Sequence, residues 1–567
     1  MTKGVRETGK TNRKMFRPVL FSILRRYTKK TFLSDLISGS IVGIVALPLA
    51  IAFAIASGVP PEVGLITAVV AGFFISFFGG SRVQIGGPSG AFIVVIAGVS
   101  AQFGMEGVVV VSLMAGIMLV IMGLLKAGSV IQFTPYPIVV GFTSGMALII
   151  FSTQMKEFFG LPDGNIPSDL LPKWIYYFRH IHLANWNAAV IGTITILVTV
   201  YWPKVTKRIP GSLVALFLTT LGVSLLNIPV ATIGSTFGEF SAKLKIPGFA
   251  GVDFDMIKIL LVPAFTIAML GSLESLLSAM VADGATGYRH RPNTELISQG
   301  LANIISPLTG GMAASGALAK TMTNVRNGGK TPVAGMIHAV VLLCFLLFMG
   351  RLAMLIPLAS LAGILVIVSY NMSEWRSFKS ILKSSKSEIS VLLTTFLLTV
   401  FVGLDVAIPF GIILALVLFV SRVMETTDIE VLRHEVENER SHVSEDSEML
   451  DIPKGVEVFQ IKGPFFFGIA NKFEEAEKEI NEIPRVRIIR MRRVPFIDST
   501  GIRNLRSFVR RSKKHHTHIV LSGVTEKTLE ALKKDGFYDE LGSENFCETI
   551  ECAMLRASKL AGRERRT

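Results

Sequence analysis

The chain has 567 residues, of which 50% are hydrophobic and only 17% charged, and its mean hydropathy is +0.54. Soluble domains carry about 25% charged residues, so this composition excludes a compact soluble enzyme and predicts an integral membrane protein. The net charge of +15 is typical of basic segments on the cytoplasmic side of a membrane protein. Three scattered cysteines, Cys344, Cys547 and Cys552, predict no disulfide framework and no cysteine-based metal site.

Residues 1–31 form a basic arm that contains a single acid, Glu7, and no apolar core of a cleavable signal peptide. A basic segment before the first apolar stretch predicts a cytoplasmic N-terminus. Charge-free stretches of at least 18 residues, near the length of a spanning helix, then follow at 36–61, 63–81, 83–105, 107–125, 127–155, 180–203, 209–238, 296–319, 331–350 and 352–373.

Three apolar regions are interrupted. Glu274 lies within 259–282, Asp405 divides 389–421, and a Ser-Pro-Leu-Thr-Gly-Gly run cuts 296–319. With these regions included, residues 32–425 are predicted to be a transmembrane domain of about 14 segments. An even number of segments returns the C-terminus to the cytoplasm.

The composition becomes that of a soluble protein beyond residue 425. An acidic linker, 426–452, precedes an α/β pattern over 453–560, and a basic tail follows at 561–567. Strands and helices that alternate predict a small parallel or mixed sheet covered by helices. The predicted strands are Val456–Lys462, Val486–Met491 and His518–Ser522, and the predicted helices are Phe473–Ile483, Gly501–Arg511 and Glu526–Lys534. Residues 426–567 are neutral overall, which argues against a nucleic-acid partner.

Two Gly-rich interruptions lie inside the membrane part, at Gly86–Gly90 and about 225 residues later at Gly310–Gly316. Paired interruptions are typical of inverted-repeat transporters. A helix that begins inside the membrane presents free N–H groups and a positive dipole end, which suit an anion. The alternative is that these residues only kink or pack helices. The predicted anion-contacting residues are Gly87, Pro88, Ser89, Gly90, Ala91, Ala314, Ser315, Gly316 and Ala317, with Ser89 and Ser315 as side-chain donors.

Two ionisable residues accompany the interruptions. Glu274 lies deep in an apolar segment, and Ser278, four residues later, shares its helix face. An ionisable group at such a depth is a functional hypothesis by default, so we expect Glu274 and Ser278 to hold a coupling cation, H+ or Na+; the alternative is a structural hydrogen bond. Lys320 follows the second interruption by about one turn and adds positive charge near the anion, unless it snorkels to the surface.

Two further patterns are weak. Gly328-Gly329-Lys330-Thr331 imitates the end of a phosphate-binding loop, but Asn324 stands where its first glycine would be, which predicts a loop between helices. His515, His516 and His518 predict a solvated turn rather than a metal site. No cofactor and no resident metal are expected, apart from Na+ at Glu274.

At these residues the chain resembles the sulfate permease (SulP) family of anion transporters. The matching pieces are Leu47–Ala50, Gly86–Gly90, Gly271–Ser275 and, longest, Gly310–Pro332. The C-terminal part is similar to STAS domains through Val494–Gly501. These pieces span nearly the whole chain.

The resemblance implies a polytopic α-helical protein with seven plus seven inverted segments, two facing half-helices, and core and gate domains. It also implies a homodimer, an elevator-like movement, cation coupling through Glu274, a basic residue near the substrate at Lys320, and a C-terminal cytoplasmic STAS domain with a cytoplasmic partner. The serine that matches Ser499 is phosphorylated in anti-sigma-factor antagonists; the alternative is that Ser499 caps a helix.

We therefore expect a multi-pass protein of the cell membrane, embedded in the lipid bilayer, that carries a small inorganic or carboxylate anion by cation symport. The alternatives are an uncoupled exchanger or channel on the same fold, and a membrane signalling protein that works through its STAS domain. Sulfate, bicarbonate and a dicarboxylate all fit a dipole-lined site, and the residues do not distinguish H+ from Na+.

Overall fold

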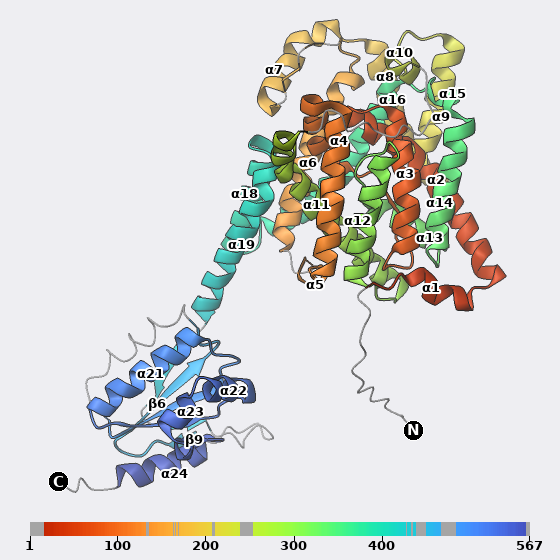
Figure 1. Cartoon of the computed structure of the whole chain (residues 1–567). Helices are drawn as coiled ribbons and strands as arrows, with labels where there is room; N and C mark the ends of the chain where they lie inside the picture. Colours follow the sequence, from red (N-terminus) through yellow and green to blue (C-terminus); the bar gives the residue numbers. More distant parts are fainter. Residues whose placement is uncertain are drawn as a thin grey trace. The chain divides into compact units, whose positions relative to one another are not determined.

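The computed structural model describes residues 16–131, 135–162, 164, 166–167, 169–206, 210–238, 253–426, 428–432, 435–437, 449–466 and 484–562. It divides into two compact units, Met1–Ala415 and Leu416–Thr567 (Figure 1). The predicted helix Phe473–Ile483, most of the predicted acidic linker, the first part of the basic arm and most of the basic tail lie outside the described residues.

The first unit is helical. Its first half contains α1 (Val19–Ile23), η1 (Leu24–Arg26), α2 (Lys29–Ala56), α3 (Pro61–Phe78), β1 (Gly86–Gly87), η2 (Gly90–Phe92), α4 (Ile93–Leu124), α5 (Gly128–Ile131), α6 (Tyr136–Phe158), α7 (Leu170–His180), η3 (Ile181–Leu183), α8 (Trp186–Val205), α9 (Gly211–Leu226) and α10 (Ile233–Phe237). Its second half contains α11 (Phe254–Thr286), α12 (Pro292–Leu308), β2 (Ser315–Gly316), α13 (Leu318–Arg326), α14 (Val333–Phe348), α15 (Gly350–Ala353), α16 (Leu358–Met372), α17 (Trp375–Ile381), α18 (Lys386–Phe401) and α19 (Leu404–Thr426), which continues into the second unit.

Among the described residues, 7 helices are long and apolar enough to cross a membrane by length and composition: α2, α3, Gly90–Leu124, α6, α8, α11 and Leu358–Ile381. Shorter apolar helices are Gly211–Leu226, Val333–Phe348 and Pro409–Met424. The predicted segments 83–105 and 107–125 are separate, as expected: α4 consists of two helices that meet at a kink at Gly104, whose φ of 61° and ψ of −157° are not helical. The remaining predicted segments correspond to α12, α13 and α18.

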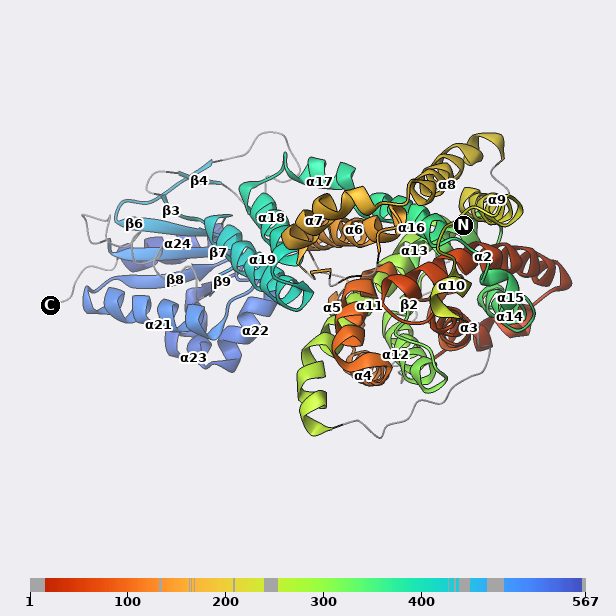
Figure 2. The same ribbon diagram turned by 90° about the horizontal axis from the view of Figure 1, so that it is seen from above.

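The helices of the first unit form two groups. In one, α2, α3, α4, α11, α12, α13 and α14 pack on one another; in the other, α6, α8, α9, α16 and α18 do so (Figure 2). Small residues allow the close contacts. A Cβ placed on Gly300 of α12 would lie 2.6 Å from the Gly116 carbonyl oxygen of α4, and one on Gly363 of α16 would lie 2.7 Å from the Gly192 carbonyl oxygen of α8. Such contacts let membrane helices associate through van der Waals packing.

The second unit has a five-stranded sheet in the order β3-β6-β7-β8-β9, parallel except for the pair β3 and β6. Apolar side chains alternate along the strands, so Phe459 and Ile489 pack against α21–α23 and Val458 and Ile488 pack against α24. The elements are β3 (Asp428–Leu432), β4 (Glu435–Glu437), β5 (Met449–Asp451), β6 (Val456–Lys462), β7 (Val486–Arg493), α21 (Ser499–Lys514), β8 (His518–Ser522), α22 (Glu526–Lys534), α23 (Phe537–Leu541), η6 (Ser543–Asn545), β9 (Phe546–Cys547) and α24 (Ile550–Ala561).

We predict that Gly300→Ala destabilises the helical unit. The added methyl group would meet backbone atoms of α4, and overpacking of this kind costs about 1–3 kcal/mol. The apparent melting temperature of the purified protein in detergent should fall. Gly222→Ala in α9 is the matched control, since a Cβ there meets nothing within 4 Å; equal melting temperatures for the two variants would contradict this packing argument.

Candidate functional site

The two Gly-rich interruptions meet each other in the structure. Strand β1 pairs antiparallel with β2, so that Gly86 lies opposite Gly316 and Gly87 opposite Ser315. After β1 the chain enters η2 and α4, and after β2 it enters α13. Two segments more than 200 residues apart in the sequence therefore start helices from one crossing point inside the first unit, as the paired-interruption pattern predicts.

Glycine is required at this crossing for two different reasons. Gly87 has φ 149°, and a Cβ on it would lie 2.8 Å from Lys320 Nζ. A Cβ on Gly316 would lie 1.7 Å from Gln84 Nε2, so any side chain there would collide with a buried amide. The crossing thus combines a backbone conformation that L side chains rarely adopt with a very close approach of neighbouring groups.

Glu274 of α11 lies at the crossing and joins its two sides. One carboxylate oxygen, Oε2, accepts hydrogen bonds from Ser89 Oγ and Ser315 Oγ, each 2.6 Å away. Ser89 precedes η2 and α4, and Ser315 belongs to β2. Both hydroxyl groups that the sequence predicts as anion donors are therefore directed at the carboxylate in this structure.

Several backbone amides of the predicted anion site are bonded within the protein. Ala91 N donates to Ser89 Oγ at 3.1 Å, Ala314 N to Asn303 Oδ1 at 2.8 Å, Gly316 N to Ser275 Oγ at 2.9 Å and Ala317 N to the Ile85 carbonyl oxygen at 2.9 Å. The N-terminus of α13, by contrast, has no side-chain cap. Its first-turn amides have no partner within the helix, and Lys320 belongs to this turn.

Lys320 is buried rather than extended toward the surface, with 2% of its surface exposed. In the part of the chain that the structure describes, its ammonium makes no hydrogen bond, and Glu274 is its oppositely charged neighbour. His338 of α14 is fully buried, and neither ring nitrogen has a hydrogen-bond partner among the described residues. A Cβ on Gly72 would lie 3.4 Å from its imidazole. The site thus contains one carboxylate, one ammonium group and one buried imidazole.

Uncharged polar residues that the sequence analysis did not single out hold the crossing in place. Gln84 Nε2 donates to the Ser275 carbonyl oxygen at 2.9 Å, and Thr321 Oγ1 accepts from Ile85 N at 3.1 Å. Ser278 Oγ bonds to Thr321 Oγ1 at 3.2 Å, so Ser278 contacts this scaffold rather than Glu274. A search for uncharged polar residues within the charge-free stretches would have found Gln84 and Asn303, whereas Thr321 directly follows Lys320 and lies outside them.

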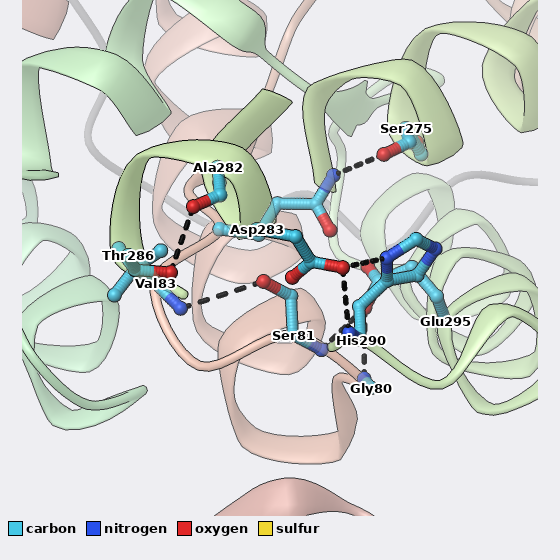
Figure 3. Close-up of polar contacts among 10 residues, drawn as sticks. Gly80, Ser81, Val83, Ser275, Ala282, Asp283, Thr286, His290 and Glu295 are labelled. Carbon is cyan, nitrogen blue, oxygen red and sulfur yellow. Dashed lines mark hydrogen bonds and ion pairs between the residues drawn. The ribbon is translucent and has the colours of Figure 1, made fainter. Parts of the chain in front are cut away.

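A second buried carboxylate supports the approach to β1. Glu295 in the first turn of α12 accepts hydrogen bonds from Gly80 N at 2.8 Å and Ser81 N at 3.0 Å (Figure 3). Beside it, His290 donates its backbone N–H to Asp283 at 2.8 Å, and its Nδ1 lies 2.6 Å from the same oxygen (Figure 3). These contacts fix the segment that leads into β1.

The Gly-Gly-Lys-Thr sequence forms a turn between α13 and α14. Asp35 of α2, fully buried, accepts from Lys330 N at 2.8 Å, Thr331 N at 3.2 Å and Thr331 Oγ1 at 2.5 Å. Tyr27 OH donates to the same carboxylate at 3.0 Å, and burial together with Asp35 raises the pKa of Tyr27 to about 12. The Asp35 carboxylate accepts from the backbone amides that a phosphate would need. These residues therefore form a loop between helices, as the sequence predicts.

In the second unit, the N-cap of α21 is Asp498, whose side chain accepts from Gly501 N at 2.7 Å. Ser499 is the first residue of the helix and is exposed. The alternative in which Ser499 caps the helix is therefore wrong, because the preceding carboxylate occupies that position. The Ser499 hydroxyl faces solvent next to a helix N-terminus.

Residues 32–395 match the sulfate permease family, and residues 449–553 match the STAS domain. The chain belongs to the sulfate permease family. The second unit is accordingly a STAS domain, and the helical unit carries the family's transport fold.

The relatives are named as transporters, not enzymes. YvdB of Bacillus subtilis (strain 168) is 39% identical over 92% of this chain and 97% of its own length. Its name describes it provisionally as a sulfate transporter. The bicarbonate transporter BicA of Picosynechococcus (strain ATCC 27264 / PCC 7002 / PR-6) is 32% identical over 88% of this chain and 90% of its own. Sulfate and bicarbonate are thus both represented among similar proteins.

Solved structures show the same fold. The murine solute carrier 26 family member A9 anion transporter, solved in an inward-facing state, superposes with a TM-score of 0.84 at 17% identity and covers 95% of this chain and 94% of its own. The transmembrane domain of a cyanobacterial BicA gives 0.60 at 30% identity, covering 69% of this chain and 98% of its own. The predicted polytopic helical fold with a C-terminal STAS domain is confirmed.

We predict that Ser89→Ala and Ser315→Ala each destabilise the helical unit more than Ser278→Ala does. Each of the first two removes a donor from a buried carboxylate, which costs about 1.5–3 kcal/mol, whereas Ser278 takes part in a neutral hydroxyl pair worth about 0.5–1.5 kcal/mol. Apparent melting temperatures in detergent measure the difference. A Ser278→Ala variant at least as destabilised as the other two would refute the central role of the carboxylate.

Proposed function

We propose that the protein is a secondary transporter that carries a small oxyanion, such as sulfate, bicarbonate or a dicarboxylate, together with H+ or Na+. The observation that carries the proposal is the pair of hydrogen bonds from Ser89 and Ser315 to one oxygen of Glu274. The two hydroxyl groups best placed to bind an anion are held by the protein's own carboxylate. Anion and carboxylate therefore compete for the same donors.

This competition supplies a coupling mechanism. A proton or Na+ on Glu274 reduces the negative charge that attracts the two hydroxyl groups. Ser89 and Ser315 can then donate to a bound anion instead. Without the cation, the ionised carboxylate keeps the donors and repels the anion, since like charges at short range in a low-dielectric site repel strongly. Anion binding and cation binding favour each other, which is the thermodynamic requirement for symport.

Positive charge for the anion comes from Lys320 and the start of α13. The Lys320 ammonium is buried with no hydrogen-bond partner among the described residues, and a buried charge is costly unless it is paired. A bound anion supplies the missing partner. The uncapped first turn of α13 adds N–H donors and the positive end of the helix dipole. Gly87 allows the ammonium to come close to β1.

The proposal extends to orientation and assembly. The basic segment before α2 places the N-terminus, and with it the STAS domain, on the cytoplasmic side of the cell membrane. The two helix groups correspond to a core that holds the crossing and a gate against which the core moves in an elevator-like way. A homodimer, and a cytoplasmic partner for the STAS domain, belong to the same proposal.

An uncoupled exchanger or channel on this fold is the second candidate, since several family members are known only as anion transporters by name. It needs no cation at Glu274. A signalling protein that works through its STAS domain is a weaker candidate, because an anchor has no use for two helices that begin at a buried crossing.

We predict that Glu274→Gln abolishes cation-driven accumulation. Glutamine binds neither H+ nor Na+ as a carboxylate does, so uptake of radiolabelled sulfate or bicarbonate into proteoliposomes should no longer respond to an imposed H+ or Na+ gradient and should fall at least about tenfold. Exposed Glu106 offers the control Glu106→Gln, which should retain gradient-driven uptake. Unchanged, still cation-driven uptake by Glu274→Gln would rule out the coupling role.

We also predict that Ser499 accepts a regulatory phosphate. It is exposed at the first position of α21, where a helix N-terminus stabilises negative charge, and the neighbouring Asp498 carboxylate limits that gain. Ser499→Glu should therefore change the uptake rate while Ser499→Ala keeps that of the unphosphorylated protein. Phosphopeptide mass spectrometry of protein purified from its native cells tests occupancy. No phosphate on Ser499, together with equal uptake by both variants, would refute the regulatory role.

A further inference from the structure

A cavity of about 310 Å³ lies apart from the crossing, next to helix α7. Its walls come from both helix groups. Val94, one residue into α4, belongs to the group that holds the crossing, while Ser152 of α6 and Thr399 of α18 belong to the other. The N-terminal turn of α7 forms the remaining wall. In both views α7 lies beside α6 (Figures 1 and 2).

Lys173 of α7 is the one lysine that lines this cavity among the described residues. Only 8% of its surface is exposed, although α7 is a short connecting helix between α6 and α8 rather than a spanning one. Its ammonium makes no hydrogen bond or close ion pair with any described residue; Asp169, one turn earlier, acts on it only as a nearby charge. Burial lowers the pKa of Lys173, and Asp169 opposes that shift.

The N-terminus of α7 faces the same cavity. Asp169 is the N-cap residue, but its side chain does not cap the helix, so the amides of Leu170 and Leu171 have no acceptor from that side chain. Both residues line the cavity. The α7 helix is 11 residues long, and its dipole adds positive potential at this end. A buried lysine and an uncapped helix end therefore converge on one space.

Contacts with α6 hold Lys173 in place. The neighbouring Trp174 donates from Nε1 to Ser152 Oγ at 3.0 Å and stacks on Phe151, with ring centroids 6.2 Å apart. Tyr177, on the next turn, is only 5% exposed. The lysine is thus part of a packed wall, unlike a surface lysine that moves freely in solvent.

We propose that this cavity is a second anion-binding site, in which Lys173 and the first amides of α7 capture a small oxyanion before it reaches the crossing. The inference rests on the proposed function for the class of ligand. It goes beyond that function by adding a site at the junction of the two helix groups. With the N-terminus in the cytoplasm, α7 faces outward, so the site receives anions from outside the cell.

Asp169 is the one acidic group that lines the cavity among the described residues, and it limits the affinity of the site for an anion. Its carboxylate balances part of the Lys173 charge, so the site is weak, as a capture site must be if the anion is to leave again. A cation would meet the Lys173 ammonium and the positive end of α7, so an anion is the favoured occupant.

The transport test compares Lys173→Met with Lys173→Arg. Removal of the charge should raise the apparent KM for external sulfate or bicarbonate about three- to tenfold with little change in the maximal rate, since charges at an entry site act mainly on association; arginine should restore the KM. Lys258→Met is the matched control, because Lys258 also follows an aspartate by one turn but its side chain is 61% exposed. Equal KM values for Lys173→Met and Lys258→Met would overturn the proposal.

A chemical test is independent of transport. Purified full-length protein is treated with acetic anhydride in sodium sulfate, or at equal ionic strength in the bulky sulfonate MES, and acetylation of Lys173 and Lys258 is quantified by mass spectrometry. Sulfate should protect Lys173 at least about threefold and leave Lys258 unchanged. Equal acetylation of Lys173 in both solutions would refute the site. Protection in a protein that transports no anion would instead contradict the proposed function and leave this site standing.

Discussion

The helical unit depends on one shared acceptor. Glu274 Oε2 takes hydrogen bonds from Ser89 and Ser315, which stand at the starts of two helical segments from opposite halves of the chain. The strand pair β1 and β2 brings the two starts together, and the carboxylate joins them. Any change in the charge of this group alters the contacts of both segments at once. The coupling of a cation to an anion that we propose therefore needs no long-range relay.

A crossing of this kind is costly in a membrane, because interrupted helices expose backbone groups where water is scarce. Side chains supply hydrogen-bond partners for these backbone groups, and most of the side chains are uncharged. Asn303 bonds both the N–H and the carbonyl oxygen of Ala314, Ser275 accepts from Gly316 N, and Thr321 accepts from Ile85 N. Glu295 serves the amides that lead into β1. Among the described residues at the crossing, the Lys320 ammonium has no hydrogen-bond partner, which leaves it free for the proposed substrate.

The sequence predicted the parts of this fold that depend on strong local signals. The two Gly-rich interruptions, Glu274 and Lys320 are conspicuous in apolar surroundings, and the structure brings all four together. In the STAS domain the strand Val456–Lys462 and the helix Glu526–Lys534 match the predicted bounds, because alternating and amphipathic patterns are clear in a soluble unit.

Other features could not be predicted because they arise from long-range contacts. Ser278 shares a face with Glu274 on an ideal helix, yet it bonds to Thr321 of another segment. The N-cap of α21 is Asp498, one residue before Ser499, because backbone geometry decides which residue takes this position. The convergence of Ser89 and Ser315 on one oxygen of Glu274 is visible only in three dimensions.

The contact between Gly316 and Gln84 has a consequence for how such proteins diversify. Since the crossing tolerates no side chain at Gly316 and little change at Gly87, its backbone geometry is a constant that natural variation must leave alone. In the anion site that we propose, selectivity among anions of different shape and charge would then be retuned at the side chains around it, chiefly at positions 89, 315 and 320. An engineer who wishes to change the cargo has a small combinatorial library to build, confined to three positions.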